Sequence, residues 1–188
     1  EDKANLMSKQ LVWLRADLRS IDNTALTAAC ADPEADIAAV YFITPEQWQH
    51  HHVAGCRVDF ELRTLQHLSK QLAALNIPLL IVETANFQSQ AQALLDLCQQ
   101  HLFSAVYFNK QYEINELARD ESVQQLLAQH QIDTFDFDDQ CLVAPYKVLT
   151  GEGRFYSVFT PFKKTWLQCI YQQGVNIQAA PDKRQSLW

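Results

Sequence analysis

Short apolar runs alternate with longer amphipathic stretches through the first 138 residues, and this alternation constrains the fold more than any other feature. The runs have the length of strands and cover residues 10–15, 37–43, 78–82, 105–109 and 134–137. The stretches between them repeat apolar side chains at helical spacing and cover residues 22–31, 53–75, 87–102 and 114–131. Strict alternation of this kind predicts a parallel sheet with helices on both faces.

Details within these segments support the same architecture. The run at 37–43 is almost continuously apolar, which is typical of a strand buried on both faces. Asp22 is the expected N-cap of the first helix, because its carboxylate can accept the free N–H groups of the first turn. Since crossovers between parallel strands are right-handed, we expect an α/β, Rossmann-like, doubly wound sheet of five strands in the order 3-2-1-4-5.

The alternation stops after residue 138 and divides the chain into an α/β unit and an extension. Residues 9–138 form the predicted α/β domain, and residues 139–173 form an extension with a helix at 162–172. Residues 174–188 are polar and are expected to begin an interdomain linker without structure of its own. Residues 1–8 are expected to be disordered or to derive from cloning, because Met7, the only methionine, marks a natural start.

Charge and cysteine content exclude several classes of function. The chain has 15 Lys and Arg against 22 Asp and Glu, and no basic block, so this piece alone is a poor nucleic-acid binder. Five widely spaced cysteines without a C-x-x-C motif indicate reduced, mostly buried thiols in a cytoplasmic protein. No apolar run is long enough for a membrane span, and no secretory signal is present at the N-terminus.

The strand order locates the expected ligand crevice. Open parallel sheets bind ligands at the carboxyl ends of the strands where the winding direction reverses, which here lies between strands one and four. The loops that leave these strands, residues 15–23 and 109–113, are both rich in polar and charged side chains. Neither contains G-x-G-x-x-G or a P-loop, and only four glycines occur in the chain, so NAD and ATP chemistry are disfavoured.

Several polar clusters have simpler interpretations than a site. The charged residues of the first loop are expected to form an ion-pair network that fixes the loop: Arg15, Asp17, Arg19 and Asp22. The run at 50–52, three histidines followed by Cys56, is expected to be a solvated helix entry rather than a metal site. The acidic group at 136–139 is expected to be a solvated loop, and Cys98 and Trp13 to be core residues.

Five blocks of sequence, in order and at the right spacing, resemble the DNA photolyase/cryptochrome family. The first, LVWLRADLRSIDNTALTAAC, follows the family pattern W-x-R-x-D-L-R-x-x-D-N-x-A-L. The others are VYFITPEQW (40–48), IPLLIVE (77–83), FNKQYEINELARD (108–120) and TGEGRFYSVFTPFKKTW (150–166). The block at 111–120 is most similar to bacterial class I photolyases that act on cyclobutane pyrimidine dimers.

The resemblance implies a light-harvesting role. Members of the family begin with an α/β antenna domain, followed by a helical domain that binds FAD and damaged DNA, and this chain resembles only the first. Folate-type members hold 5,10-methenyltetrahydrofolate and pass its excitation to the flavin. Other members carry an 8-hydroxy-deazaflavin deeper in the α/β domain or no antenna pigment at all. The resemblance therefore implies a DNA-repair lyase as the whole protein and an inactive fragment here.

The same resemblance assigns candidate pigment contacts. The family's Asn-Glu pair, which contacts the pterin, matches Asn115 and Glu116, and Tyr112 and Lys110 are weaker candidates from the same loop. A carboxylate can accept two N–H groups of a pterin edge, and an amide can both donate and accept. The alternative interpretation is that Asn115 and Glu116 only begin a helix, because acidic residues suit a helix N-terminus.

Two other functions remain open at this stage. A cryptochrome-type photoreceptor shares the fold, although the block at 112–116 argues against it. A stand-alone nucleotide-binding module of the doubly wound class is the third candidate. No catalytic residue or metal ligand is expected in any of these cases, because an antenna needs only a rigid mount for its pigment.

Overall fold

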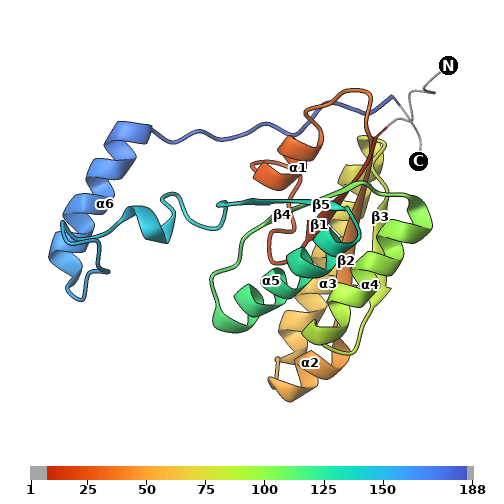
Figure 1. The fold of residues 1–188 in the computed structure, drawn as a ribbon, viewed down its shortest axis with the longest axis horizontal. Coiled ribbons are helices and arrows are strands. Elements are labelled where there is room, and N and C mark those ends of the chain that lie inside the picture. Colours follow the sequence, from red (N-terminus) through yellow and green to blue (C-terminus); the bar gives the residue numbers. More distant parts are fainter. Residues whose placement is uncertain (1–7, 186–188) are drawn as a thin grey trace.

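A computed structural model describes residues 8–185 of the chain and shows one five-stranded, all-parallel sheet with helices on both sides (Figure 1). The strands are β1 (Lys9–Leu14), β2 (Asp36–Ile43), β3 (Leu79–Glu83), β4 (Ala105–Asn109) and β5 (Asp133–Phe137). Their order in the sheet is β3-β2-β1-β4-β5, which confirms the predicted doubly wound topology. The predictions for residues 1–7 and 186–188 concern residues outside this described range.

The core forms two layers because successive side chains of a strand point to opposite faces of the sheet. On β1, Leu11 and Trp13 join the layer beneath α4 (Phe87–His101) and α5 (Ile114–Gln129). Val12 and Leu14 join the opposite layer, beneath α1 (Thr24–Ala29) and α3 (Gly55–Ala74). Burial on both faces explains why β1 and β2 are almost continuously apolar.

The cap of α1 and the presence of α2 differ from the sequence-based expectation. The N-cap of α1 is Asn23, whose side chain accepts the N–H of Leu26 at 3.1 Å, so the assignment of this role to Asp22 was wrong. Asp22 instead has a φ of 54°, and its backbone N–H donates to the carbonyl of Gln178 at 2.8 Å. The short helix α2 (Pro45–His50) was not predicted, because it buries no residue and has no apolar face to repeat.

The extension stands apart from the sheet (Figure 1). It contains the 3₁₀ helix η1 (Pro145–Lys147) and α6 (Phe159–Gln173), which is longer than the predicted helix at 162–172 and has no buried residue. Large apolar side chains of this region are exposed, among them Phe155, Phe159 and Tyr171.

The segment after α6 returns along α1 to the sheet and is anchored there (Figure 1). Arg184 is 7 % exposed and donates to the carbonyls of Cys30 at 3.1 Å and Ala35 at 2.8 Å. Its backbone N–H donates to Leu75, and its carbonyl accepts from Asn76. The described part of this segment forms no helix or strand, but it makes specific contacts with the α/β unit that the sequence did not predict.

Two further findings concern the thiols and the membrane. The five cysteines are all free, and only Cys98 is buried, so the expectation that most are buried was wrong. Within residues 8–185, no helix combines the length and the apolar character needed to span a membrane.

Candidate functional site: a pocket at the carboxyl edge of the sheet

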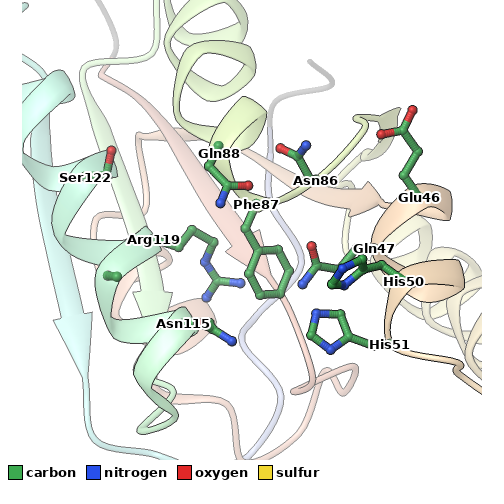
Figure 2. Close-up of a pocket in the computed structure, with 11 residues that line it drawn as sticks. Glu46, Gln47, His50, His51, Asn86, Phe87, Gln88, Asn115, Arg119 and Ser122 are labelled. Atoms are coloured by element: carbon green, nitrogen blue, oxygen red, sulfur yellow. The ribbon is translucent and has the colours of Figure 1, made fainter.

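An open pocket of about 650 Å³ lies where α4 and α5 begin and α2 ends (Figure 2). These helices start directly after β3, β4 and β2, so the pocket is at the carboxyl edge of the sheet. Its volume falls in the range of roughly 300–1,000 Å³ that ligand pockets usually have. Carboxyl-edge pockets are the usual ligand sites of open α/β sheets.

Each helix contributes planar or polar side chains to the wall. Gln47, His50 and His51 come from the end of α2, and Phe87 lies opposite them in the first turn of α4 (Figure 2). Asn86 lines the pocket and also caps α4, since its side chain accepts the N–H of Ser89 at 3.2 Å.

The start of α5 forms the third wall and carries one of the predicted contacts. Asn115 is exposed and lines the pocket, while Glu116 follows it in the first turn, is half-buried and is not among the lining residues. The N-cap, Glu113, makes no side-chain hydrogen bond to the helix, so it leaves the first-turn N–H groups of α5 uncapped. One turn further on, Arg119 lines the same pocket with a side chain that is only 4 % exposed.

A stack of alternating rings and guanidinium groups lies behind this wall. The Cζ atom of Arg119 lies 4.8 Å from the ring centroids of both Phe87 and Trp13. The guanidinium of Arg15 also stacks on Trp13. Its Cζ atom lies 4.5 Å from the ring centroid of Trp13 and 4.7 Å from that of Phe108. Cations over aromatic rings are stabilised by the ring quadrupole, and more so when they are desolvated.

One carboxylate holds both guanidinium groups in place. Asp120 Oδ1 accepts from Arg15 Nη1 at 3.0 Å and from Arg119 Nη2 at 2.7 Å, and all three side chains are less than a tenth exposed. Burial lowers the pKa of Arg15 to about 10, although Asp120 opposes the shift, so this guanidinium stays charged at neutral pH. The pocket thus rests on a buried group with two cations and one anion.

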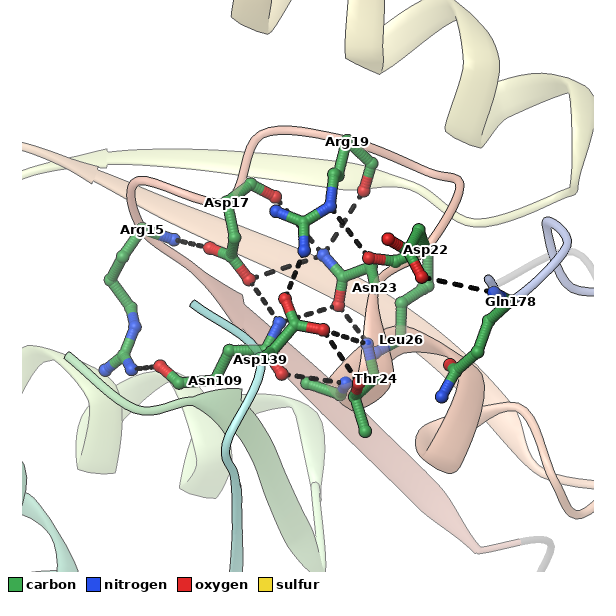
Figure 3. A network of polar contacts seen from close by, with 11 residues as sticks. Arg15, Asp17, Arg19, Asp22, Asn23, Thr24, Leu26, Asn109, Asp139 and Gln178 are labelled. Atoms are coloured by element: carbon green, nitrogen blue, oxygen red, sulfur yellow. Dashed lines mark hydrogen bonds and ion pairs between the residues drawn. The ribbon is translucent and has the colours of Figure 1, made fainter. Parts of the chain in front are cut away.

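The expected crevice between β1 and β4 is filled by hydrogen bonds (Figure 3). Asn109, at the end of β4, donates through Nδ2 to Asp17 at 2.6 Å and to Asn23 at 2.9 Å. Its Oδ1 atom accepts the backbone N–H of Ala25 at 3.0 Å. The strand order therefore predicted the correct edge of the sheet. The pocket, however, lies beside the point between β1 and β4 where the winding direction reverses, and not at that point itself.

The charged residues of the first loop bond to other segments and not mainly to each other. Arg15 pairs with Asp120, and Arg19 pairs with Asp139. Asp139 also accepts from the N–H of Thr24 at 3.1 Å and from its hydroxyl at 2.7 Å (Figure 3). The expectation of a solvated acidic loop was wrong for Asp139, whose side chain is 7 % exposed.

Lys110 and Tyr112, the two weaker candidates, lie together at a different place. Tyr112 donates to Asp138 at 2.8 Å, Lys110 Nζ lies 3.5 Å from the same carboxylate, and Tyr146 of η1 also bonds to it. Burial alone would raise the pKa of Asp138, but the hydrogen bonds from Tyr146 and Tyr112 and the charge of Lys110 outweigh it and lower the pKa. This cluster ties the α/β unit to the extension, and its members are not among the residues that line the pocket.

Most of the pocket residues were not predicted from the sequence. His50 and His51 drew attention only as a metal-like run, and no cluster of three or more potential ligands exists among the described residues. Phe87 and Arg119 sit in patterns that also fit an ordinary amphipathic helix. The charge of Arg119 at a buried helical position was the one signal that pointed to a special role.

Fold and pocket together define a doubly wound α/β domain with an open pocket at its carboxyl edge. The sequence profile of the family described as DNA photolyase matches residues 10–182, and the chain belongs to this family.

Named relatives support the assignment. The chain is 47 % identical over 160 residues to the deoxyribodipyrimidine photo-lyase of Vibrio cholerae, covering 84 % of this chain and 34 % of that protein. It is 41 % identical to the enzyme of the same name from Salmonella typhimurium, covering 96 % of this chain and 38 % of that protein. The crystal structure of a Synechocystis cryptochrome shares the fold, with a TM-score of 0.79 at 21 % identity, over 95 % of this chain and 37 % of that one. The chain thus spans little more than a third of these relatives.

Proposed function

We propose that this chain is the antenna domain of a DNA photolyase and that its pocket binds 5,10-methenyltetrahydrofolate. The observation that carries the proposal is the pocket at the carboxyl edge, which Asn115 lines at the start of α5. Glu116 stands next to Asn115 in the same helical turn. The pigment's excitation would pass to FAD in a C-terminal domain, where light drives the repair of pyrimidine dimers.

The chemistry of the pocket suits a pterin. Asn115 in the wall and Glu116 beside it offer an amide and a carboxylate for the aminopyrimidinone edge, whose N–H groups need acceptors and whose carbonyl needs a donor. The uncapped N–H groups at the start of α5 are further donors for that carbonyl. Phe87 and His51 add planar surfaces against which a flat ring system can pack.

A pigment deeper in the domain is less well supported. The interior beside β1 and β4 is occupied by Asn109, Asp17 and Asn23, which satisfy one another's hydrogen bonds. Opening this network for a deazaflavin would leave several buried polar groups without partners, which is costly. The surface pocket needs no such rearrangement.

Roles of the remaining candidates follow from their contacts. Asn115 and Glu116 are the proposed pigment contacts, whereas Lys110 and Tyr112 hold Asp138 and shape the loop that leads into α5. The named bacterial relatives are photo-lyases at 41–47 % identity, which favours a repair enzyme of the cytoplasm over a cryptochrome photoreceptor.

The proposal also assigns the parts of the chain. Residues 9–138 form the antenna domain, 139–173 the extension, and 174–188 the start of the connection to the FAD domain. The partners of the whole protein are this FAD domain and, through it, damaged DNA. The exposed apolar side chains of the extension are consistent with such a neighbour.

The absorption spectrum of the purified full-length protein tests the proposal. Glu116→Ala should remove the near-ultraviolet absorption of the folate and leave flavin-driven repair largely intact. Glu121→Ala is the control, because Glu121 is an exposed acid of the same helix that lies outside the first turn and is not adjacent to the lining residue Asn115. Unchanged folate absorption in Glu116→Ala would refute the site, and a protein that never carries folate would refute the choice of pigment.

A further inference from the structure

A domain that binds a light-harvesting pigment must not quench the excited state of that pigment. An excited pterin is a stronger oxidant than its ground state and can take an electron from a nearby indole or phenol. The wall of the pocket, within the described residues, contains no tryptophan, tyrosine, cysteine or methionine. Trp13, however, lies directly behind Arg119, with the guanidinium 4.8 Å from its ring centroid.

The position of Trp13 makes it a candidate quencher. Trp13 is 1 % exposed, so bulk solvent does not screen the indole from nearby charges. A ligand in contact with Arg119 is separated from the indole by one side chain only. Electron transfer over so short a gap would compete with the passage of excitation to another cofactor.

The two cations on the indole oppose this reaction. Arg15 and Arg119 both place their Cζ atoms within 5 Å of the Trp13 ring centroid, at 4.5 and 4.8 Å. Asp120 pairs with both guanidinium groups and Asp17 also acts electrostatically on Arg15, but the groups that stack on the ring are the two cations. A positive charge close to the ring, in a medium of low polarity, makes removal of an electron from that ring harder.

We propose that Arg15 and Arg119 act as an electrostatic shield that keeps Trp13 from donating an electron to the excited pigment. The inference rests on the proposed function, since it requires a light-absorbing ligand in the pocket. In the reaction that the shield prevents, one electron leaves the indole and reduces the excited pigment. The return of that electron restores both groups and loses the absorbed energy as heat.

The shield also explains why both guanidinium groups are kept buried at such cost. Two buried cations sharing one carboxylate are unfavourable for stability unless each has further partners. Arg119 finds one in Gln111 at 2.9 Å, and Arg15 in the carbonyl of Asn109, while the rings supply the remaining contacts. A hydrophobic core at this position would pack as well without charges, but it would leave the indole easily oxidised.

The fluorescence lifetime of bound methenyltetrahydrofolate tests the shield in full-length protein freed of flavin, so that energy transfer does not shorten the lifetime. Arg119→Leu should shorten it several-fold, because one of the two cations on the indole is lost while the carboxylate of Asp120 remains. Arg119→Lys should keep most of the lifetime, since the charge remains. The lifetime belongs to each bound molecule, so a lower occupancy does not alter it.

Removing the proposed quencher provides the decisive comparison. Arg119→Leu with Trp13→Phe should regain the original lifetime, whereas Arg119→Leu with Trp48→Phe should not, because the tryptophan on which Arg15 and Arg119 stack is Trp13. Trp13→Phe alone should leave the lifetime unchanged. A longer lifetime in that single variant would overturn the shield, because it would show that Trp13 quenches despite the cations.

The outcomes separate this inference from the proposed function. If the full-length protein binds no folate, the proposed function fails. If folate binds but its lifetime is the same in the unmodified protein, in Arg119→Leu and in the double variants, only the shield fails.

Discussion

Two neighbouring parts of the same sheet edge differ in what fills them. Where β1 and β4 end, Asn109 donates hydrogen bonds to Asp17 and to Asn23, so these polar groups are already paired with one another. Beside them, between α2, α4 and α5, the side chains enclose a pocket of about 650 Å³. Topology determines which edge can bind a ligand, whereas the pairing of polar side chains determines which part of that edge stays open.

The largest expected effect comes from the carboxylate that joins the two parts. Asp120→Ala removes the only anion shared by Arg15 and Arg119 and should lower the free energy of unfolding by about 3–5 kcal/mol. Urea unfolding measures this loss. Glu121→Ala, one residue along and exposed, should change the same quantity by less than about 0.5 kcal/mol. Similar losses in both variants would contradict the buried group described here.

A pair of asparagines sharpens the contrast between the filled and the open part. Asn109→Ala should lower the free energy of unfolding by about 1–3 kcal/mol, because it leaves buried partners without hydrogen bonds. Asn115→Ala should leave stability unchanged, since Asn115 is exposed, but should reduce the folate content of the full-length protein. Thermal or urea unfolding together with the absorption spectrum measures both. The contrast would break if Asn115→Ala destabilised the fold as much as Asn109→Ala.

The smallest expected effect concerns pH and the cluster around Asp138. The folded pKa of Asp138 is lowered, so its contribution to stability is present above the ordinary value of about 3.9 and is lost as the pH falls through the lower folded value. Asp138→Asn should abolish this part of the acid dependence. Urea unfolding at a series of pH values between about 5 and 2 would show it as a convergence of the two stability curves toward acid. Parallel curves would contradict the role of Asp138.

Much of the architecture was predictable because the alternation of strand-like and helical segments is typical of only a few folds. Five apolar runs separated by helical stretches, with right-handed crossovers, leave few strand orders, and the predicted one is the observed one. The strand at 105–109 was predicted with its observed bounds, since its sequence AVYFN is closed by polar residues on its carboxyl side.

The site was less predictable because it depends on partners that are far apart in the chain. Asp139 looks like a loop residue until β5 carries it next to Thr24 and Arg19. α2 has only six residues and buries none of them, so His50 and His51 gave no helical signal. Asn115 was identified through the resemblance of this chain to the photolyase family. No rule of residue spacing would have placed it in the pocket.

Blocking the pocket tests the central claim most directly. Ala118 is exposed on α5 and lines the pocket, so Ala118→Trp should fill it without disturbing the core. Ala128→Trp is the control, an exposed alanine on the same helix that does not line the pocket. The full-length Ala118→Trp protein should contain flavin but no folate absorption, while Ala128→Trp should contain both. Full folate absorption in Ala118→Trp would contradict the claim that this pocket holds the pigment.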